Sequence, residues 1–333
     1  MTQYALSLLN QNGKLRANLI NNENMNIVPI VFAFDNNIIQ AACVCISSLM
    51  MNAKSDTFYD IFILHAKDVN LNKDELNKIT TYYKNCKIQY RVVGDEFDNA
   101  FEIRHVTKAT YYRLLIPNII TEYDRVIYSD VDIIFQMDLA DVYNEDISDY
   151  YIAATLDLGL NNNKKYIDSV KGLEAGKYIQ AGFAIFNVKK MREDNMVSIF
   201  LNLTKNNYTY QDQDVLNIAC KDKIKYLPPC YNVNDCALIY MNWHPELLPK
   251  SISAQDCDYA RKTGNIHYSG YKPWQRYSIG FDIWWEYYRK SPFYDEQFYF
   301  KFFFDKTMLL ESLTLWKRIK ILIRYFVYGR YKG

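Results

Sequence analysis

The feature that most constrains this chain is an apolar run over residues 125–135 with two aspartates at its centre, Asp130 and Asp132. A continuous apolar run is typical of a strand buried on both faces, and side chains two positions apart on a strand point the same way. Two carboxylates on one side of a strand end repel each other unless a cation lies between them. The pair is therefore a candidate site for Mg²⁺ or Mn²⁺ with a phosphate-bearing ligand, although many Asp-x-Asp triplets are turn or cap residues.

Composition narrows the class of protein. The chain has 333 residues, half of them hydrophobic, which suffices for one large α/β domain or one domain with additions. A net charge of +1 argues against a general nucleic-acid binder. The sequence contains neither G-x-G-x-x-G nor G-x-x-x-x-G-K-[ST], which disfavours a dinucleotide-dependent dehydrogenase and a P-loop NTPase.

Localisation is predicted from cysteines and hydropathy. The seven cysteines lack zinc-ligand spacing, so we expect free thiols in a reducing, cytoplasmic setting. The N-terminus lacks a signal-peptide pattern, and no stretch approaches the roughly 20 apolar residues of a membrane span. Residues 1–25 are polar and Asn-rich, and we interpret them as an N-terminal extension.

The order of predicted elements indicates an α/β half-domain of the nucleotide-binding type. In such sheets ligands bind at the C-terminal ends of strands, where Asp35 and the aspartate pair are expected. Strands are predicted over 27–34, 60–65, 87–93, 151–157 and 178–188, helices over 38–52, 70–84, from 188 through 201 and from 211, and a strand leading into a tight loop over 266–274.

The segment from about 308 to 333 differs from the rest, because apolar residues at helical spacing alternate with six Lys and Arg against the single Glu311. We interpret it as a basic amphipathic helix on an anionic membrane surface. The alternative is a terminal helix docked on the domain with a solvated basic face. We accordingly divide the chain into residues 1–25, a catalytic domain at 26–280 and a helical region at 281–333.

Six short segments, in order, carry a resemblance to a known family. They are VFAFDNN at 31–37, IRH at 103–105 with TYYRL at 110–114, YSDVD at 128–132, AGF at 181–183 with Asn187, YQDQD at 210–214, and 267–274. On these segments the chain resembles family 8 of the retaining glycosyltransferases over residues 27–275, most closely the bacterial enzymes that add galactose or glucose to lipopolysaccharide or related glycans. This implies a GT-A type nucleotide-diphospho-sugar transferase fold: α/β, with a mixed, mainly parallel sheet flanked by helices, plus a C-terminal helical extension.

The resemblance also implies site residues. Asp130, Asp132 and His267 would bind Mn²⁺ or Mg²⁺. The UDP-sugar would contact Ala33, Asp35, Asn37, Val131, Gln180-Ala181-Gly182, Gly270 and Lys272. The catalytic residues would be Gln213, beneath the anomeric carbon, and Arg113, Asp157 and Asp212, near the donor sugar. Acceptor-facing positions are His105, Tyr210 and Ser269.

Two departures from the family and three alternatives accompany these assignments. Gln180 stands where the family usually has Asn, and the loop between Gly270 and Lys272 is one residue shorter than in many members. The alternative role of Asp35 is a helix N-cap, that of Arg113 an ion pair with a buried aspartate, and that of His267 a half-buried histidine with satisfied hydrogen bonds.

The implied reaction is transfer of galactose or glucose from a UDP-sugar to the hydroxyl of a glycan or glycolipid, with retention and without nucleic-acid partners. Because an amide is a poor nucleophile, Gln213 favours front-face attack over double displacement. Three alternatives stay open: a non-catalytic sugar-binding protein, a sugar-nucleotide nucleotidyltransferase, and a UDP-sugar hydrolase.

Overall fold

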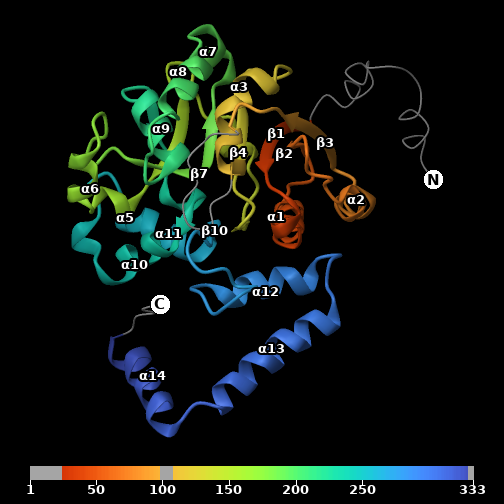
Figure 1. The fold of residues 1–333 in the computed structure, drawn as a ribbon, viewed down its shortest axis with the longest axis vertical. Helices are drawn as coiled ribbons and strands as arrows, with labels where there is room; N and C mark the ends of the chain where they lie inside the picture. The colour runs from red at the N-terminus through yellow and green to blue at the C-terminus, as the bar shows by residue number, and fades with distance from the viewer. Residues whose placement is uncertain (1–24, 98–107, 329–333) are drawn as a thin grey trace.

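A seven-stranded mixed sheet forms the middle layer of the molecule (Figure 1). The computed structural model describes residues 25–97 and 108–328. Strand order is β3-β2-β1-β4-β7-β6-β8, in which only β7 runs antiparallel to its neighbours. The strands are β1 (Asn26–Ala33), β2 (Thr57–Ala66), β3 (Cys86–Val93), β4 (Val126–Ser129), β6 (Ile152–Leu156), β7 (Ile179–Phe186) and β8 (Ile224–Tyr226). The predicted α/β architecture with a mainly parallel sheet is confirmed.

Helices cover both faces of this sheet (Figure 1). One face packs on α1, whose residues Ala41–Met50 are all buried, and the other packs on the helices that follow β7. The helices between β1 and β8 are α1 (Ile39–Met51), α2 (Lys73–Tyr82), α3 (Ile116–Ile119), α4 (Ala140–Tyr143), α5 (Leu158–Asn161), α6 (Lys164–Ser169), α7 (Val188–Glu193), α8 (Met196–Leu203) and α9 (Gln211–Ala219), with 3-10 turns at Asn36–Ile38 and Lys108–Leu115.

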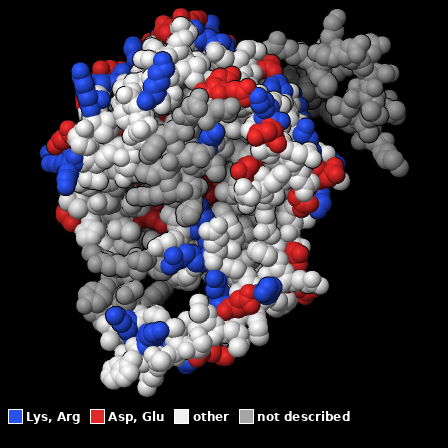
Figure 2. Space-filling model, viewed as in Figure 1, with Lys and Arg blue, Asp and Glu red and all other residues white. Residues whose placement is uncertain are grey.

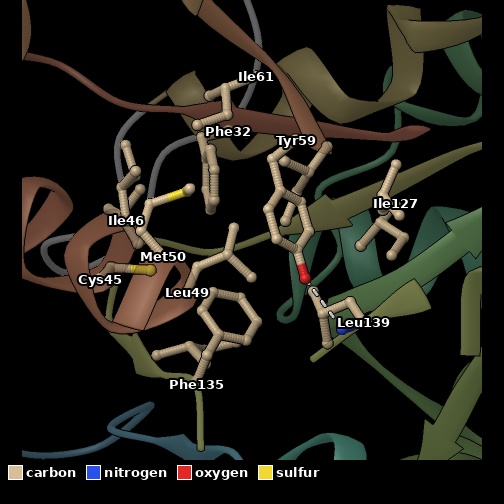
Figure 3. Close-up of a cluster of buried hydrophobic side chains, with 14 of the residues drawn as sticks. Phe32, Cys45, Ile46, Leu49, Met50, Tyr59, Ile61, Ile127, Phe135 and Leu139 are labelled. Atoms are coloured by element: carbon tan, nitrogen blue, oxygen red, sulfur yellow. Dashed lines mark hydrogen bonds between the residues drawn. The ribbon is translucent and has the colours of Figure 1, made fainter. Parts of the chain in front are cut away.

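Alternating residues of the strands separate the two hydrophobic clusters. On β1, Ile30 and Phe32 pack toward α1, and Val31 packs on the opposite cluster. Figure 3 shows the α1 side, where the Tyr59 hydroxyl accepts a hydrogen bond from Leu139 N at 3.0 Å. The apolar run of β1 is therefore the signature of a strand covered on both faces.

The aspartate pair lies in a turn, not on the strand we predicted. β4 ends at Ser129, and the chain resumes as β5 (Ile133–Ile134) in a separate three-stranded sheet with β10 (Ile266–His267) and β9 (Val233–Asn234). The apolar residues on each side are buried as expected, but they belong to two sheets. The turn between them positions both carboxylates at the C-terminal edge of the large sheet.

Two predicted helices are each divided in the structure. The helix expected from 188 through 201 is α7 and α8, separated at Asn195, whose φ of 50° is left-handed. The single helix expected over about 308–333 is also wrong, because 308–311 end α13 (Glu296–Glu311) and α14 (Leu315–Tyr328) begins after a break at Ser312.

The C-terminal helices extend below the sheet (Figure 1). α12 (Phe281–Lys290) buries Trp284, Trp285 and Tyr288 against the core, while α13 rests one aromatic face on α12 and exposes the other. The remaining helices are α10 (Asp235–Trp243) and α11 (Ala254–Thr263), with 3-10 turns at Pro229–Tyr231 and Pro245–Leu247. Over the described residues, no helix has both the length and the hydropathy needed to cross a bilayer. All seven cysteines are free, as predicted.

Candidate active site

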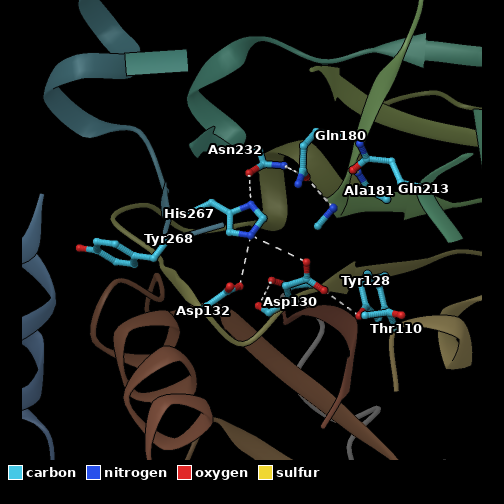
Figure 4. A network of polar contacts seen from close by, with 12 residues as sticks. Thr110, Tyr128, Asp130, Asp132, Gln180, Ala181, Gln213, Asn232, His267 and Tyr268 are labelled. Atoms are coloured by element: carbon cyan, nitrogen blue, oxygen red, sulfur yellow. Dashed lines mark hydrogen bonds and ion pairs between the residues drawn. The ribbon is translucent and has the colours of Figure 1, made fainter. Parts of the chain in front are cut away.

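Asp130, Asp132 and His267 converge from distant parts of the chain. Each offers one ligand atom, and these atoms all lie within 4.8 Å of one another (Figure 4). Backbone hydrogen bonds fix the turn, since Asp130 N donates to Gly182 O at 2.7 Å and Tyr268 N donates to Asp132 O at 2.9 Å. The small sheet thus brings His267 to the turn that follows β4.

The residues of this triad fit a hard divalent cation. Asp132 Oδ1 is buried without a hydrogen bond, although His267 Nε2 lies 3.2 Å from it. Burial would raise the pKa of Asp132, but the positive charge of Lys272 and the proximity of His267 hold that pKa below the ordinary carboxyl value. A Cβ on Gly182 would collide with the His267 ring and would lie 2.7 Å from Asp130 Oδ2. An orphaned oxygen and a space that only glycine leaves open are consistent with a metal site.

A chain of amides orients His267. Its Nδ1 lies 2.8 Å from Asn232 Oδ1, so a proton on Nδ1 leaves the Nε2 lone pair facing the carboxylates. Asn232 Nδ2 donates in turn to Gln180 Oε1 at 2.6 Å, and the same oxygen accepts from Gly182 N. We did not predict Asn232, because no local pattern in the sequence distinguishes it. The amide oxygen of Gln180 thus supports the histidine, and the contact with the donor that the family resemblance implies for Gln180 stays a prediction.

Arg113 occupies the opposite side of Asp130. Its guanidinium is 2.8 Å from Asp130 Oδ1 and 3.0 Å from Asp212 Oδ2, and it donates to Ala181 O at 2.6 Å. Burial lowers the pKa of Arg113, but the two carboxylates outweigh it and keep that pKa above its ordinary value. The Tyr128 ring lies 4.2 Å below the guanidinium carbon, and its hydroxyl donates to Asp130 Oδ1. Arg113 therefore forms the buried ion pair considered as its alternative role.

The first turn of α9 presents two of the predicted catalytic side chains. Gln211 is buried with a left-handed φ of 45°, a strained conformation for a residue with a side chain. Burial raises the pKa of the next residue, Asp212, to about 6 despite Arg113. Gln213 Oε1 accepts from Ala181 N at 3.0 Å, and its Nε2 donates to Asp157 Oδ2 at 3.2 Å.

Asp214 holds this turn and was not predicted. Its carboxylate is fully buried and accepts hydrogen bonds from the hydroxyls of Tyr166 at 2.5 Å and Tyr178 at 2.6 Å, and from Tyr210 N at 2.9 Å. Burial raises the pKa of Asp214, and these bonds oppose the rise. Only the tertiary structure reveals this clamp of two tyrosines on Asp214.

Asp157 follows β6 and faces the same site. Its Oδ1 accepts from Leu160 N at 2.8 Å, which caps α5, and burial raises its pKa. With Gln213 and Asp212 it forms a row of polar side chains beside the triad. Of the four predicted catalytic residues, Arg113, Asp157, Asp212 and Gln213, the structure brings all together at one edge of the sheet.

A cavity lies at the C-terminal ends of the parallel strands β1, β2 and β3. Asp35 caps the turn after β1 by accepting from Asn37 N at 2.9 Å, the N-cap role considered as its alternative. Ala33 is half-buried at the end of β1, and Val131 is buried in the turn after the neighbouring β4. The cavity has a volume of about 250 Å³ and is lined by Phe34, Asp35, Ala66, Lys67, Asp68, Val69, Gly94, Asp95, Lys108, Ala109 and Tyr112.

The remaining predicted residues lie nearer the solvent-exposed side of the candidate active site. Lys272 Nζ is 2.5 Å from Asp132 Oδ2 and also donates to Tyr268 O. Ser269 and Gly270 are exposed in the loop after β10, and Tyr210 is 36% exposed at the start of α9. His105 falls outside the described residues.

Comparisons with known proteins agree with this geometry. The model of the family described as Glycosyl transferase family 8 matches residues 29–278. A putative glycosyltransferase of Haemophilus influenzae is 33% identical over a match that covers 61% of this chain and 62% of that protein's length. The lipopolysaccharide 1,2-glucosyltransferase of Escherichia coli is 25% identical over 79% of this chain and 76% of its own length.

A solved structure supports the same assignment. The galactosyltransferase LgtC, in complex with donor and acceptor sugar analogs, is 25% identical with a TM-score of 0.68 over 82% of this chain and 100% of that chain. Because the family model matches three quarters of the sequence and the neighbours share the fold, the chain belongs to glycosyltransferase family 8.

Proposed function

We propose that this protein is a retaining hexosyltransferase that moves galactose or glucose from a UDP-sugar to a hydroxyl of a glycan or glycolipid, in the synthesis of lipopolysaccharide or another cell-surface glycan. The observation that supports it most is the single edge where the triad Asp130, Asp132 and His267 adjoins the polar row Asp157, Asp212 and Gln213. One part suits a diphosphate with its cation, the other a sugar.

The chain's own residues have separable tasks. Asp130, Asp132 and His267 would hold Mn²⁺ or Mg²⁺, which supplies Lewis-acid stabilisation of the departing diphosphate. Lys272 lies close enough to this point to place a further positive charge on a phosphate oxygen. Asp35 and the cavity beside it would hold the nucleoside.

Retention of configuration restricts how the sugar reacts. Gln213, beneath the predicted sugar position, has both amide atoms engaged, and an amide is a poor nucleophile. Asp212 is buried and paired with Arg113, which lowers its readiness to attack. We favour front-face attack, in which the leaving phosphate oxygen accepts the acceptor's proton. A covalent sugar trapped on Asp212 would contradict this route.

The decisive experiment is UDP release from a panel of UDP-sugars, with Mn²⁺ and with EDTA, by the wild type and Asp132→Asn. We expect turnover of UDP-galactose or UDP-glucose that needs the metal and disappears in the variant, since Asn offers a weaker ligand in the same shape.

Other outcomes identify the alternatives. No turnover and no Mn²⁺-dependent UDP binding would exclude the transferase and favour a non-catalytic binding protein. Metal-dependent UDP release that no acceptor stimulates would indicate a hydrolase. Release of pyrophosphate from UTP and a sugar phosphate would indicate a nucleotidyltransferase.

Peripheral membrane contact is part of the proposal. α14 carries Lys317, Arg318 and Lys320 beside Trp316, which is 80% exposed. In Figure 2 the lower edge of the molecule, where α13 and α14 lie in Figure 1, is mostly uncharged with Lys and Arg near α14. An exposed apolar surface with local basic charge suits an anionic membrane on the cytoplasmic side. The other three of the six Lys and Arg predicted for this segment, Arg324, Arg330 and Lys332, lie outside the described side chains.

A further inference from the structure

The start of α10 lies against the metal-site candidate. β9 pairs in parallel with β10, and Asn234 is opposite His267 in this register. α10 begins at Asp235, directly after β9, so its first residue emerges beside the loop that follows His267. The side chain of Asn234 caps α10 by accepting a hydrogen bond from Ala237 N at 2.8 Å, which fixes the start of the helix at Asp235.

Two glycines allow α10 to approach the site this closely. A Cβ on Gly270, in the loop after His267, would lie 2.6 Å from Asp235 Oδ2. A Cβ on Gly159 would lie 2.9 Å from Cys236 Sγ and 3.4 Å from Asp157 Oδ1. The first turn of α10 therefore lies along one side of the site, with Asp235 beside the loop after His267 and Cys236 beside Gly159, close to Asp157.

Asp235 differs from the other carboxylates of the site. Asp157, Asp212 and Asp214 are each held by hydrogen bonds or an ion pair, whereas no donor within residues 25–97 and 108–328 reaches the Asp235 side chain. Burial raises the pKa of Asp235, and His267 and Lys272 oppose the rise. A carboxylate in this place repels a diphosphate, so it needs a different ligand.

We propose that Asp235 is an acceptor-binding residue, which accepts hydrogen bonds from the hydroxyls of a neutral saccharide. It disfavours acceptors that carry a carboxylate or phosphate beside the reacting hydroxyl. The inference rests on the proposed function, because front-face transfer requires the acceptor to enter next to the departing phosphate. Asp235, which lies against Gly270 in the loop after His267, would border that entrance.

The test compares Asp235→Asn with Asp222→Asn, which removes one charge at an exposed turn where Asn also tolerates the φ of 64°. The acceptor is the neutral saccharide that most increases UDP release by the wild type. We expect Asp235→Asn to raise the acceptor KM about tenfold through loss of a charged hydrogen bond. Acceptor-free UDP-hexose hydrolysis and Mn²⁺ affinity, measured from the electron paramagnetic resonance signal of free Mn²⁺, should stay within about twofold.

A charged acceptor sharpens the test. Asp235→Asn should reduce the preference for the neutral saccharide over its uronic acid counterpart by about tenfold, because the like-charge repulsion is gone. An unchanged acceptor KM, a wild type that uses only anionic acceptors, or a loss of Mn²⁺ affinity in Asp235→Asn would each overturn the inference alone. A wild type that consumes no UDP-hexose would overturn the proposed function and the inference with it.

Discussion

Two regions of this molecule reverse the usual distribution of side chains, and they do so in opposite directions. At the C-terminal edge of the sheet, Arg113, Asp212 and Asp214 are buried charged or ionisable groups. On the C-terminal helices, Leu315, Trp316 and Phe304 are 71%, 80% and 65% exposed. The first region removes charge from water, and the second leaves apolar surface in it.

The physical consequences of the two reversals differ. A buried charge is stable only when its partners are in place, so each residue at the sheet edge depends on its neighbours. Exposed apolar side chains on α13 and α14 need no fixed partner within the chain. They are expected to gain one only when the protein meets another surface. Perturbations should therefore be large and specific at the edge, and small and additive on the helices.

The largest effect is expected from Gly182→Ala. The added Cβ would meet the His267 ring and lie 2.7 Å from Asp130 Oδ2, so the ligands must separate. We expect Mn²⁺ affinity, read from free Mn²⁺ by electron paramagnetic resonance, to fall at least about 100-fold. UDP release should fall with it.

Gly176→Ala is the matched control. Its Cβ meets nothing within 4 Å, while its φ of 80° strains any side chain. It should cost about 1 kcal/mol of stability and leave Mn²⁺ affinity unchanged. Equal Mn²⁺ affinities in Gly182→Ala and the wild type would contradict our view of the triad.

The next effect is a pH dependence of stability in metal-free protein. Because burial raises the pKa of Asp212 to about 6, the folded state holds this proton more tightly than the unfolded state. The contribution to stability is complete below about pH 4 and is lost as pH rises through about 6. Between about pH 4 and 7 the free energy of unfolding of the wild type, relative to Asp212→Asn, should fall by about 2 kcal/mol in urea titrations. A difference that is constant with pH would exclude this shift.

A smaller effect is expected when the clamp on Asp214 is opened. Tyr178→Phe removes a buried hydroxyl that donates to Asp214 at 2.6 Å, and we expect a loss of about 2 kcal/mol in unfolding free energy. Tyr226→Phe, which removes a half-exposed hydroxyl bonded to Lys177 O, should cost well under about 1 kcal/mol. If both substitutions cost the same, the sheet edge is not more sensitive than the surface.

The smallest effect per residue is expected on α14. Lys317→Gln with Lys320→Gln should weaken binding to phosphatidylglycerol vesicles by about 1 kcal/mol per lysine, and added salt should erase the difference. UDP release with a soluble acceptor should not change. Lys205→Gln with Lys262→Gln removes the same charge from positions elsewhere on the surface. Equal vesicle binding by both double variants would contradict the proposed contact between α14 and an anionic membrane.

The sequence by itself determined the class of fold and the members of the triad. The run over 125–135, the strand over 27–34 and the order of elements each depend on local periodicity, which burial imposes on any chain of this kind. The C-terminal helices were recognised by composition, but their break at Ser312 was not, because no Gly or Pro marks it.

Only the tertiary structure decided which groups support the site. Asn232, Asp214 and Asp235 are ordinary residues in the sequence, and each acquires its place from elements that are distant along the chain. The aspartate pair shows how far local patterns predict structure. The sequence predicted a strand there, but the pair lies in a turn where the chain passes from the large sheet to the small one. Periodicity records whether a side chain is buried. Which partner it meets there depends on packing between elements, and no local pattern encodes that.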